Sequence, residues 1–561
     1  MQKACTNCSI PFGVTEADLT FYEKISPRFG GKSFPLPPPT LCPDCRNMRR
    51  LAFRNERCLY RRTCDLTGKP LLSIYNTDVP FPVYSYDAWW SDDWDALSYG
   101  REFDPARPFF EQFEKLFRCV PRLGIVTGHN ENCDYCNYTN YSKSSYLCFG
   151  CHTVDHCFHN WRTHWCEHCV DCLQLNKCTL CYECIDCDEC YNLRFSQDCS
   201  TCSDSAFLYD CRGCTHCVGC VGLRNREYSL FNEQLNEKTY AQKMKQLQLH
   251  TPDGIEKTQM KFKEFKQEKP HRNLFIFNSE NANGDHIFDS HNLRECYHVK
   301  RAEDCSYLES CEDIRDSMDS SFSGWPAELV YETMSAGVTC YNFLFCTASW
   351  SCSNLIYCDN CHHSSNLFGC IGLRKKNQYC ILNKQCTKEE YEELVPKVIA
   401  HMQSTREWGQ FFPQYLSPHA YNETIAYGYY PLTETEVNSR GWGWREETDE
   451  MPKMEKVIPG DSLPETIDQT PEDVLNWAIL CKISTRPFKI IKQELEFYRQ
   501  MQLPLPRLHP DERYRRRMAC RNPRKLWRRK CSKCGKEMET TYGPERPEIV
   551  CCEECYLAAV Y

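Results

Sequence analysis

Long apolar runs are missing from this sequence. Its 561 residues contain no stretch approaching the ~18 to 20 apolar residues that a membrane span needs, and no early apolar run of signal-peptide length. We therefore expect a cytoplasmic protein with no membrane partner. In a reducing cytosol disulfides are disfavoured, so the 44 Cys predict metal ligands or buried thiols.

The signatures of common enzymes are missing too. There is no serine-centred nucleophile elbow, no phosphate-binding glycine loop and no dinucleotide fingerprint. Asp and Glu are plentiful, but they are plentiful on any solvated surface and identify no catalytic pair. We assign no catalytic residue and expect a non-enzymatic binding protein of several domains.

Positive charge is scarce overall and concentrated locally. The formal net charge is −9 and the pI is about 6.1, which excludes a basic coat over the whole surface. Residues 46–62, however, contain seven Arg and one Glu, and residues 507–533 contain twelve Lys or Arg and two acidic residues. These two segments are the candidates for binding an anionic partner.

The two basic segments belong to a repeated module. Residues 42–69 align without a gap with residues 509–536, which places Cys64 on Cys531. We infer that both ends of the chain have the same fold.

Each module retains four cysteines with the spacing of a zinc site, because Zn²⁺ is commonly held by two Cys-x-x-Cys turns. The two complete sets are Cys5, Cys8, Cys42 and Cys45, and Cys531, Cys534, Cys552 and Cys555. The first resembles a treble-clef finger, in which the second pair opens a helix, and the second resembles a zinc ribbon. We predict two structural Zn²⁺ ions, since closed four-thiolate sites leave no position for a substrate.

The matching position in the other copy is degenerate in each case. The treble-clef set becomes Cys481, Ser484, His509 and Glu512, and the ribbon set is reduced to Cys64 beside Thr67 and Ser85. We expect both degenerate sets to be empty.

The middle of the chain repeats cysteine at every third position, as in CTLCYECIDCDEC at 178–190. This period belongs to neither a helix nor a strand. It predicts a tight β-solenoid whose corners turn one residue in three toward its axis, over residues 126–225 and again over 281–375, with a register slip at 323–328. The turn length is left open, although Leu193, Leu208 and Leu223 recur at fifteen residues.

The ladder cysteines are interpreted as buried, reduced thiols that pack like small apolar residues. The alternative is metal storage or a thiol redox relay, which requires neighbouring thiols to converge on shared ions. Two stretches match the Cys-x-x-Cys-His haem motif, but His152 and His362 would point outward, and no haem is expected.

The predicted fold class is mainly β with helical caps. In chain order we expect an N-terminal zinc module (1–97), a connecting helix (98–125), the first solenoid (126–225), a helical cap and linker (226–280), the second solenoid (281–375), a second cap and linker (376–475) and the C-terminal zinc module (476–561).

Essentially the whole chain resembles a group of Cys-rich zinc-ribbon and solenoid proteins predicted in reduced-genome bacteria. The resemblance rests on LCPDCR at 41–46, RNERCLYRRTCDLTGK at 54–69 and the GLR motif that ends each solenoid. It implies no activity. The C-terminal module departs from it where HPDER replaces CPDCR.

The functional lead is the set of arginines that follows each knuckle position. In the N-terminal copy they recur at three- and four-residue steps, which predicts one helical face. Guanidinium groups bind phosphate in forked geometry, and neighbouring aromatic residues suit stacking on unpaired bases. The candidate nucleic-acid-binding residues are Arg46, Arg49, Arg50, Arg54, Arg57, Arg513, Arg516, Arg517, Arg521, Arg524, Arg528 and Arg529.

We favour RNA or another nucleic acid as the partner of these arginines. The alternative is that they dock on a protein partner, or on acidic parts of the chain itself such as WWSDDWD at 89–95. The chain would then be a structural or protein-interaction scaffold.

Overall fold

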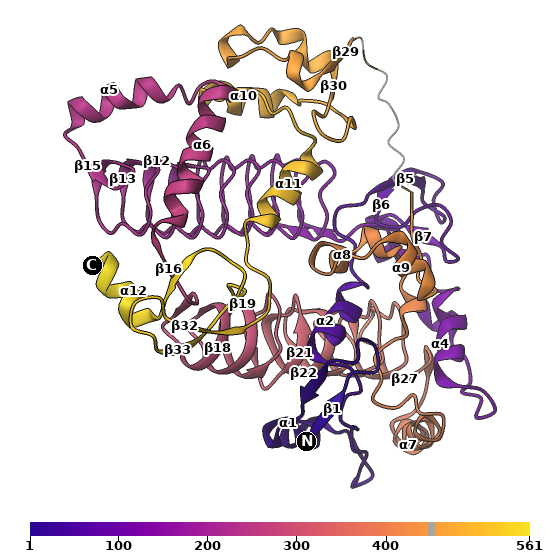
Figure 1. Ribbon diagram of the computed structural model, residues 1–561. Helices are drawn as coiled ribbons and strands as arrows, with labels where there is room; N and C mark the ends of the chain where they lie inside the picture. The colour runs from indigo at the N-terminus through magenta and orange to yellow at the C-terminus, as the bar shows by residue number, and fades with distance from the viewer. Residues whose placement is uncertain (447–453, 455) are drawn as a thin grey trace. The chain divides into compact units, whose positions relative to one another are not determined.

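The computed structural model describes residues 1–446, 454 and 456–561 (Figure 1). Their secondary structure is mixed, with about 25% helix and 31% strand, so the predicted mainly β class is confirmed only in part. Part of the predicted linker 376–475, namely 447–453 and 455, lies outside the described residues. No helix within the described ranges has the length and apolar character needed to cross a bilayer.

The chain forms two compact units, each assembled from segments far apart in the sequence. Unit 1 comprises Met1–Ile125, Leu274–Arg445 and Arg524–Leu526, and unit 2 comprises Val126–Asn273, Glu446–Pro523 and Trp527–Tyr561. The N-terminal module therefore belongs with the second Cys-rich segment, and most of the C-terminal module belongs with the first. The seven predicted segments are not seven consecutive domains.

Unit 1 carries the N-terminal module and the second Cys-rich segment. Its helices are α1 (Glu16–Ile25), α2 (Pro43–Leu51), α3 (Tyr86–Trp90), α4 (Phe109–Phe117), α7 (Lys388–Ser404), α8 (Ile425–Tyr429) and α9 (Glu434–Ser439). Its shorter strands are β1 (Gln2–Ala4), β2 (Pro11–Gly13), β3 (Arg28–Phe29), β4 (Lys32–Ser33), β5 (Tyr60–Thr63), β6 (Pro70–Ser73), β7 (Val83–Tyr84) and β8 (Arg122–Leu123). The largest sheet of unit 1 contains β17 (Ile276–Phe277), β18 (Glu280–Phe288), β19 (His291–Ser306), β20 (Glu312–Arg315), β21 (Met318–Ser321), β22 (Gly324–Gly337), β23 (Cys340–Leu344), β24 (Thr347–Trp350), β25 (Ser353–Ile356), β26 (Ser365–Phe368), β27 (Gln378–Ile381) and β28 (Lys384–Gln385).

Unit 2 carries the first Cys-rich segment and most of the C-terminal module. Its helices are α5 (Glu237–Leu247), α6 (Pro252–Gln267), α10 (Lys492–Gln500), α11 (Pro510–Ala519) and α12 (Glu553–Val560). Its strands are β9 (Thr127–Gly128), β10 (Thr139–Asn140), β11 (Tyr191–Arg194), β12 (Ser203–Ala206), β13 (Thr215–Val218), β14 (Glu227–Leu230), β15 (Glu233–Gln234), β16 (Pro270–Arg272), β29 (Lys456–Pro459), β30 (Trp477–Leu480), β31 (Pro487–Phe488), β32 (Trp527–Lys530), β33 (Glu537–Thr540) and β34 (Ile549–Cys551).

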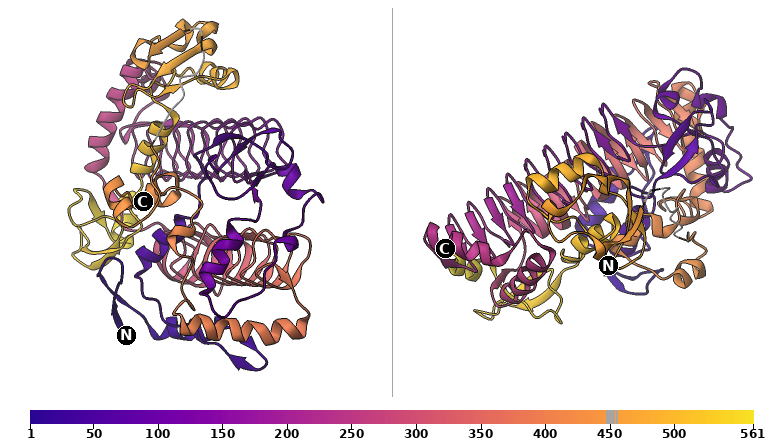
Figure 2. Two further views of the ribbon diagram at one scale, coloured as in Figure 1. Left: turned by 90° about the vertical axis from the view of Figure 1, so that its right-hand side faces the viewer. Right: turned by 90° about the horizontal axis from the view of Figure 1, so that it is seen from above.

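The first Cys-rich segment is a coil of twelve-residue turns. Through residues 127–230, here called the first coil, parallel bridges join outward residues twelve positions apart, as in Glu131 with Lys143. Figures 1 and 2 show the turns as a stack of loops. The fifteen-residue recurrence of leucine is not the turn length, because those leucines sit on successive sides, one turn and one side apart.

Each side of a turn has three residues with different roles. The first points inward, the second forms the parallel bridge, and the third turns the corner with a positive φ, such as 55° at Asp171 and 50° at Glu183. Asn, Asp and His adopt this left-handed conformation more readily than most residues, and they are frequent at these corners. The three-residue period of the sequence is therefore the period of one side.

Cysteine and serine line the interior because their side chains accept hydrogen bonds from the backbone N–H groups of inward residues. The N–H of Cys157 donates to Ser145 Oγ at 3.3 Å, and that of Cys190 donates to Cys178 Sγ at 3.4 Å, in each case one turn earlier. The Cys178 thiol in turn donates to the carbonyl of Cys187 at 3.6 Å. A small side chain that donates and accepts weakly fills the narrow interior and satisfies the backbone at once.

The buried-thiol interpretation is confirmed for the ladder. Its cysteines from Cys136 to Cys220 are all buried, and Cys133 at the start is half-buried. In the part of the chain that the structure describes, none of them belongs to a group of three or more ligand atoms close enough to share a metal ion. The convergence that metal storage requires is not seen among these residues.

The second coil, residues 276–381, is less regular. Ile314 pairs with Ala327, thirteen positions later, which is the predicted slip at 323–328. Gly324 lies at this irregularity with φ 141°, and a Cβ there would lie 1.7 Å from a carbonyl oxygen of the preceding turn. Only glycine fits this position.

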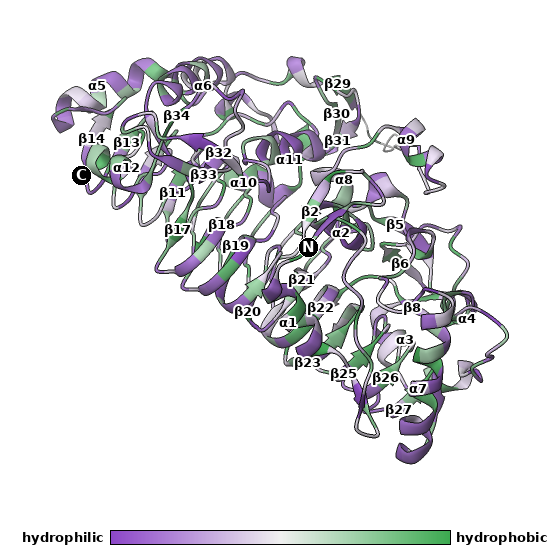
Figure 3. Cartoon of the chain, turned by 60° about the horizontal axis from the view of Figure 1, so that its bottom comes forward, coloured by the Kyte–Doolittle hydropathy of each residue, from purple (hydrophilic) through white to green (hydrophobic). Residues whose placement is uncertain are grey.

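A helix follows the last turn of each coil and forms a cap with the strand before it. An antiparallel strand, β15 or β28, closes the last turn, and α5 or α7 follows it. Helix α7 buries Tyr391, Val395 and Ile399 along one face, and both caps also show hydrophilic residues in Figure 3. The caps cover strand edges that would otherwise be open to further pairing.

Candidate metal centres and arginine docks

The four N-terminal cysteines converge at the start of helix α2. The turn between β1 and β2 carries Cys5 and Cys8, while Cys42 is the N-cap residue of α2 and Cys45 lies in its first turn. All four sulfurs lie within 4.8 Å of one another, with Cys8 Sγ 3.7 Å from Cys42 Sγ. This geometry could hold a metal ion.

Backbone N–H groups favour the thiolate form at this site. Burial disfavours the thiolate of Cys5, but the N–H groups of Cys42, Cys8 and Asn7 outweigh burial and lower the pKa of Cys5 to about 6. Asn7 Nδ2 also donates to Cys45 Sγ at 3.2 Å. Thiolates are the form of cysteine that binds metal, and donors to sulfur orient them.

The four C-terminal cysteines form an equivalent cluster. The turn between β32 and β33 carries Cys531 and Cys534, and α12 begins with Cys552 as N-cap and Cys555 in its first turn. Their sulfurs also lie within 4.8 Å of one another. Burial again opposes ionisation, but backbone N–H groups, that of Cys534 foremost, lower the pKa of Cys531 to about 6.

The residues left at the degenerate positions have structural partners. His509 Nδ1 accepts the backbone N–H of Asp511 at 3.1 Å and so caps α11. Cys64 Sγ accepts the backbone N–H of Ser85 at 3.3 Å. At both degenerate positions, hydrogen bonds between a side chain and the backbone therefore stabilise the local structure.

The arginines of the N-terminal module dock on the second coil. Arg46 Nε lies 2.8 Å from Asp319, and Arg50 Nη1 lies 3.2 Å from Asp319 and 3.1 Å from Glu332. Arg49 also reaches Glu332, at 2.8 Å. The side chains of Arg46, Arg50, Asp319 and Glu332 are at most 2% exposed, so water does not screen these ion pairs.

The arginines of the C-terminal module dock on the first coil. Arg513 and Arg517 converge on Asp171, with Arg517 Nη1 2.9 Å from Asp171 Oδ1. Arg521 Nε lies 3.1 Å from Asp186. All three arginine side chains are less than 10% exposed.

The two docks match position by position. Asp319 and Asp171 are both corner residues of their coils, and each accepts the aligned pair of arginines from its own module. One turn and one corner farther along each coil, Arg54 meets Ser335, as its counterpart Arg521 meets Asp186. Each unit thus repeats the same attachment of a module to a coil.

Several candidate arginines lie elsewhere than predicted. Helix α2 ends at Leu51 and α11 ends at Ala519, so Arg54, Arg57, Arg521 and Arg524 do not continue a helical face. Arg516 and Arg528 are exposed, whereas Arg57 and Arg529 are partly buried, and Arg524 pairs with Glu309 within unit 1. The acidic stretch 89–95 does not supply the carboxylates of either dock.

The chain matches none of the protein-family models and none of the curated proteins with which it was compared.

Proposed function

We propose that this chain is a non-enzymatic scaffold in which two zinc-stabilised modules are fastened to two β-solenoids. The observation that carries the proposal is the buried arginine dock, which recurs at aligned positions in both units. A contact built twice from the same residue types is an element of the architecture.

The two four-cysteine clusters support zinc as the metal. Four cysteine sulfurs within 4.8 Å of one another suit a structural Zn²⁺ ion, and each cluster joins a knuckle to the start of a helix. The twelve-residue bridging pattern supports the solenoid assignment of both coils.

The docks favour the scaffold over nucleic-acid binding by the arginine helices. Arg46, Arg50 and Arg54 of one module are buried, as are Arg513 and Arg517 of the other. These guanidinium groups could reach a phosphate backbone only by leaving their carboxylates. Breaking such buried pairs costs about 3 to 5 kcal/mol, which a surface contact with phosphate does not offset.

Helix α11 offers a matched test, because it carries docked and exposed arginines side by side. Arg513→Ala with Arg517→Ala removes the dock, whereas Arg515→Ala with Arg516→Ala removes the same charge from exposed positions. We expect amide hydrogen exchange in α11 and in residues 159–186 to rise at least 100-fold in the first variant and to stay unchanged in the second. Equal exchange in the two variants would refute the docking role.

A further inference from the structure

The C-terminal ribbon carries a cluster of exposed basic side chains that are not among the docked arginines. Arg528 and Lys530 lie on β32, and Lys533 and Lys536 lie on the knuckle that carries two of the cysteines. All four are exposed, and within the described residues none of them forms an ion pair, although Glu539 and Glu537 lie opposite Arg528 and Lys530 in the hairpin. Residues 527–540 contain five basic and two acidic residues, so the hairpin keeps a surplus of positive charge.

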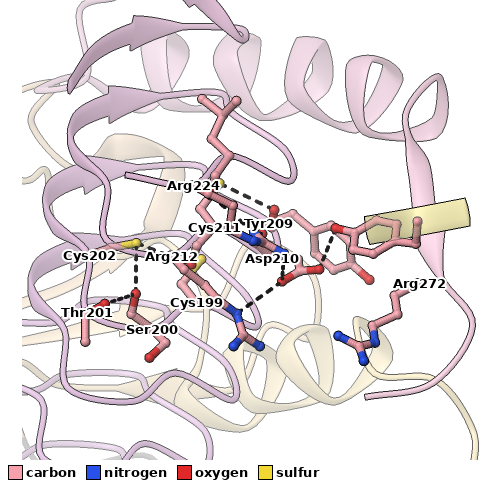
Figure 4. Close-up of polar contacts among 12 residues, drawn as sticks. Cys199, Ser200, Thr201, Cys202, Tyr209, Asp210, Cys211, Arg212, Arg224 and Arg272 are labelled. Carbon is pink, nitrogen blue, oxygen red and sulfur yellow. Dashed lines mark hydrogen bonds and ion pairs between the residues drawn. The ribbon is translucent and has the colours of Figure 1, made fainter. Parts of the chain in front are cut away.

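The ribbon is attached to the first coil through other residues. Tyr556 of α12 donates to Asp210 Oδ2 at 2.5 Å, and the hydroxyls of Tyr209 and Tyr542 lie 2.9 Å apart. Figure 4 shows Asp210 and Tyr209 side by side at the edge of the coil, where Arg224 also reaches Asp210. The attachment therefore does not use the four exposed cations.

The aligned hairpin of the N-terminal module keeps two of these four cations, because Arg61 and Lys69 stand at the positions of Arg528 and Lys536. Thr63 stands at the position of Lys530, and Leu66 at that of Lys533. Arg62 is held by Asp65 at 3.0 Å. The C-terminal hairpin therefore carries two exposed cations, Lys530 and Lys533, that its N-terminal copy does not have.

Neutralising the metal site does not account for these cations. A Zn²⁺ ion with four thiolates carries about two negative charges, which adjacent lysines would balance. The N-terminal site has the same four ligands, yet its knuckle residues Thr6, Asn7 and Ser9 carry no charge. Metal binding alone therefore does not require a basic knuckle.

We propose that this basic knuckle, Arg528, Lys530, Lys533 and Lys536, binds the phosphodiester backbone of single-stranded RNA. A polyanion with regularly spaced phosphates suits a run of solvent-exposed cations that has no apolar centre of the kind found in protein interfaces. Trp527, half-buried at the start of β32, provides an aromatic edge beside the cations. The proposal does not depend on the arginine docks.

The test is fluorescence anisotropy of a labelled 20-nucleotide oligo(U) between ~50 and ~200 mM salt. Four phosphate contacts predict a log–log salt slope of roughly −2.8. Changing all four cations to Gln should weaken binding at least tenfold at ~50 mM salt and bring the slope close to zero, with zinc content unchanged.

Two controls make the result specific. Changing Lys238, Lys245, Lys257 and Lys492 to Gln removes the same charge from exposed helical positions and should leave binding unchanged. Binding of oligo(dT) with the same slope would support recognition of the backbone. No salt-dependent binding by the wild type, equal loss in the control, or equal competition by polyglutamate would overturn the proposal, whereas hydrogen exchange in α11 would still report on the docks.

Discussion

Unit 1 and unit 2 use the same dock but stabilise its helix differently. In unit 1 the docked helix α2 begins inside a four-cysteine cluster, with Cys42 as its N-cap. In unit 2 the docked helix α11 has His509 as its N-cap, and the ring of His509 accepts a backbone N–H. For the ribbon position the distribution is reversed: the four-cysteine set is complete in the C-terminal module and reduced to Cys64 in the N-terminal module. The dock is the constant feature, and a four-cysteine cluster is retained beside it in unit 1 and in the neighbouring ribbon in unit 2.

The carboxylates of the two docks differ as well. In unit 1, Asp319 and Glu332 divide three arginines between them. In unit 2, Asp171 serves both Arg513 and Arg517. At the corner that matches Glu332, burial raises the pKa of the Glu183 carboxyl, although Arg517 opposes the shift. In unit 2 the close contacts of both arginines converge on Asp171, and Glu494 lies farther away, 3.8 Å from Arg513.

The largest difference between the two units should appear when a metal-site cysteine is replaced. Cys5→Ser should remove one of two bound zinc ions and release α2 from the second coil, because structural zinc contributes ~10 kcal/mol or more to folding of isolated fingers. Cys481→Ser, at the aligned position of the other module, should leave zinc content unchanged. Elemental analysis together with hydrogen exchange in α2 measures both. An unchanged zinc content in the first variant would show that this cluster holds no metal.

Removing the shared acid should come next. Asp171→Asn leaves Arg517 without its close carboxylate and leaves Arg513 with the more distant Glu494, at 3.8 Å, so we expect unit 2 to lose about 3 to 5 kcal/mol of stability. Asp319→Asn should cost less, since Glu332 still neutralises Arg50. Urea unfolding followed by hydrogen exchange in α11 and α2 gives the two values. The comparison between the docks fails if Asp319→Asn proves the more damaging change.

Acid should affect unit 2 through the same residue. Burial alone would raise the pKa of Asp171, but Arg513 and Arg517 outweigh it and hold the pKa below its usual value of 3.8. A depressed carboxyl pKa contributes stability that is present above the unfolded pKa and is lost as pH falls through the folded value. We expect α11 to lose protection below about pH 4, and Asp171→Asn to abolish this dependence. A transition that persists in the variant would assign it to other carboxyls.

The smallest effect should come from single ladder cysteines. Cys178→Ala removes the acceptor of the Cys190 N–H and should destabilise the first coil by about 1 to 3 kcal/mol. Cys178→Ser keeps an acceptor and should cost less. Ser349→Ala is the matching change in the second coil, where Ser349 Oγ accepts the N–H of Cys361 at 3.0 Å. A higher urea midpoint for Cys178→Ala than for Cys178→Ser would contradict the role of this side chain as a hydrogen-bond acceptor.

Local chemistry could be predicted from the sequence because it depends on residues at fixed short spacings. Both four-cysteine sets, their degenerate counterparts and the slip near residue 324 follow from such spacings. The three-residue period identified the inward positions, since each side of a turn repeats inward, bridge and corner. A coil interior needs only the residues of neighbouring turns, and these are close in sequence.

The partners of the arginines could not be found in the same way. Asp171 and Asp319 lie hundreds of residues from the arginines that bind them, and a corner aspartate resembles any other surface carboxylate. A usable signal was the twelve-residue recurrence of apolar outward residues, such as Phe158, Val170 and Tyr182, which marks a covered side next to Asp171. The column can be identified in the sequence only when the turn length is known.

The interleaving of the two units has a consequence for synthesis on the ribosome. The first coil ends at Leu230, but the arginines that cover its Asp171 corner are not made until Arg513 and Arg517 are translated. At ~5 to 20 residues per second, the coil stays uncovered for on the order of 15 to 60 s, with an uncompensated acid and an apolar side exposed. A nascent chain of this kind gives chaperones and competing coils time to bind, so slowing translation after Leu230 should increase misassembly even though every residue of the finished protein is unchanged.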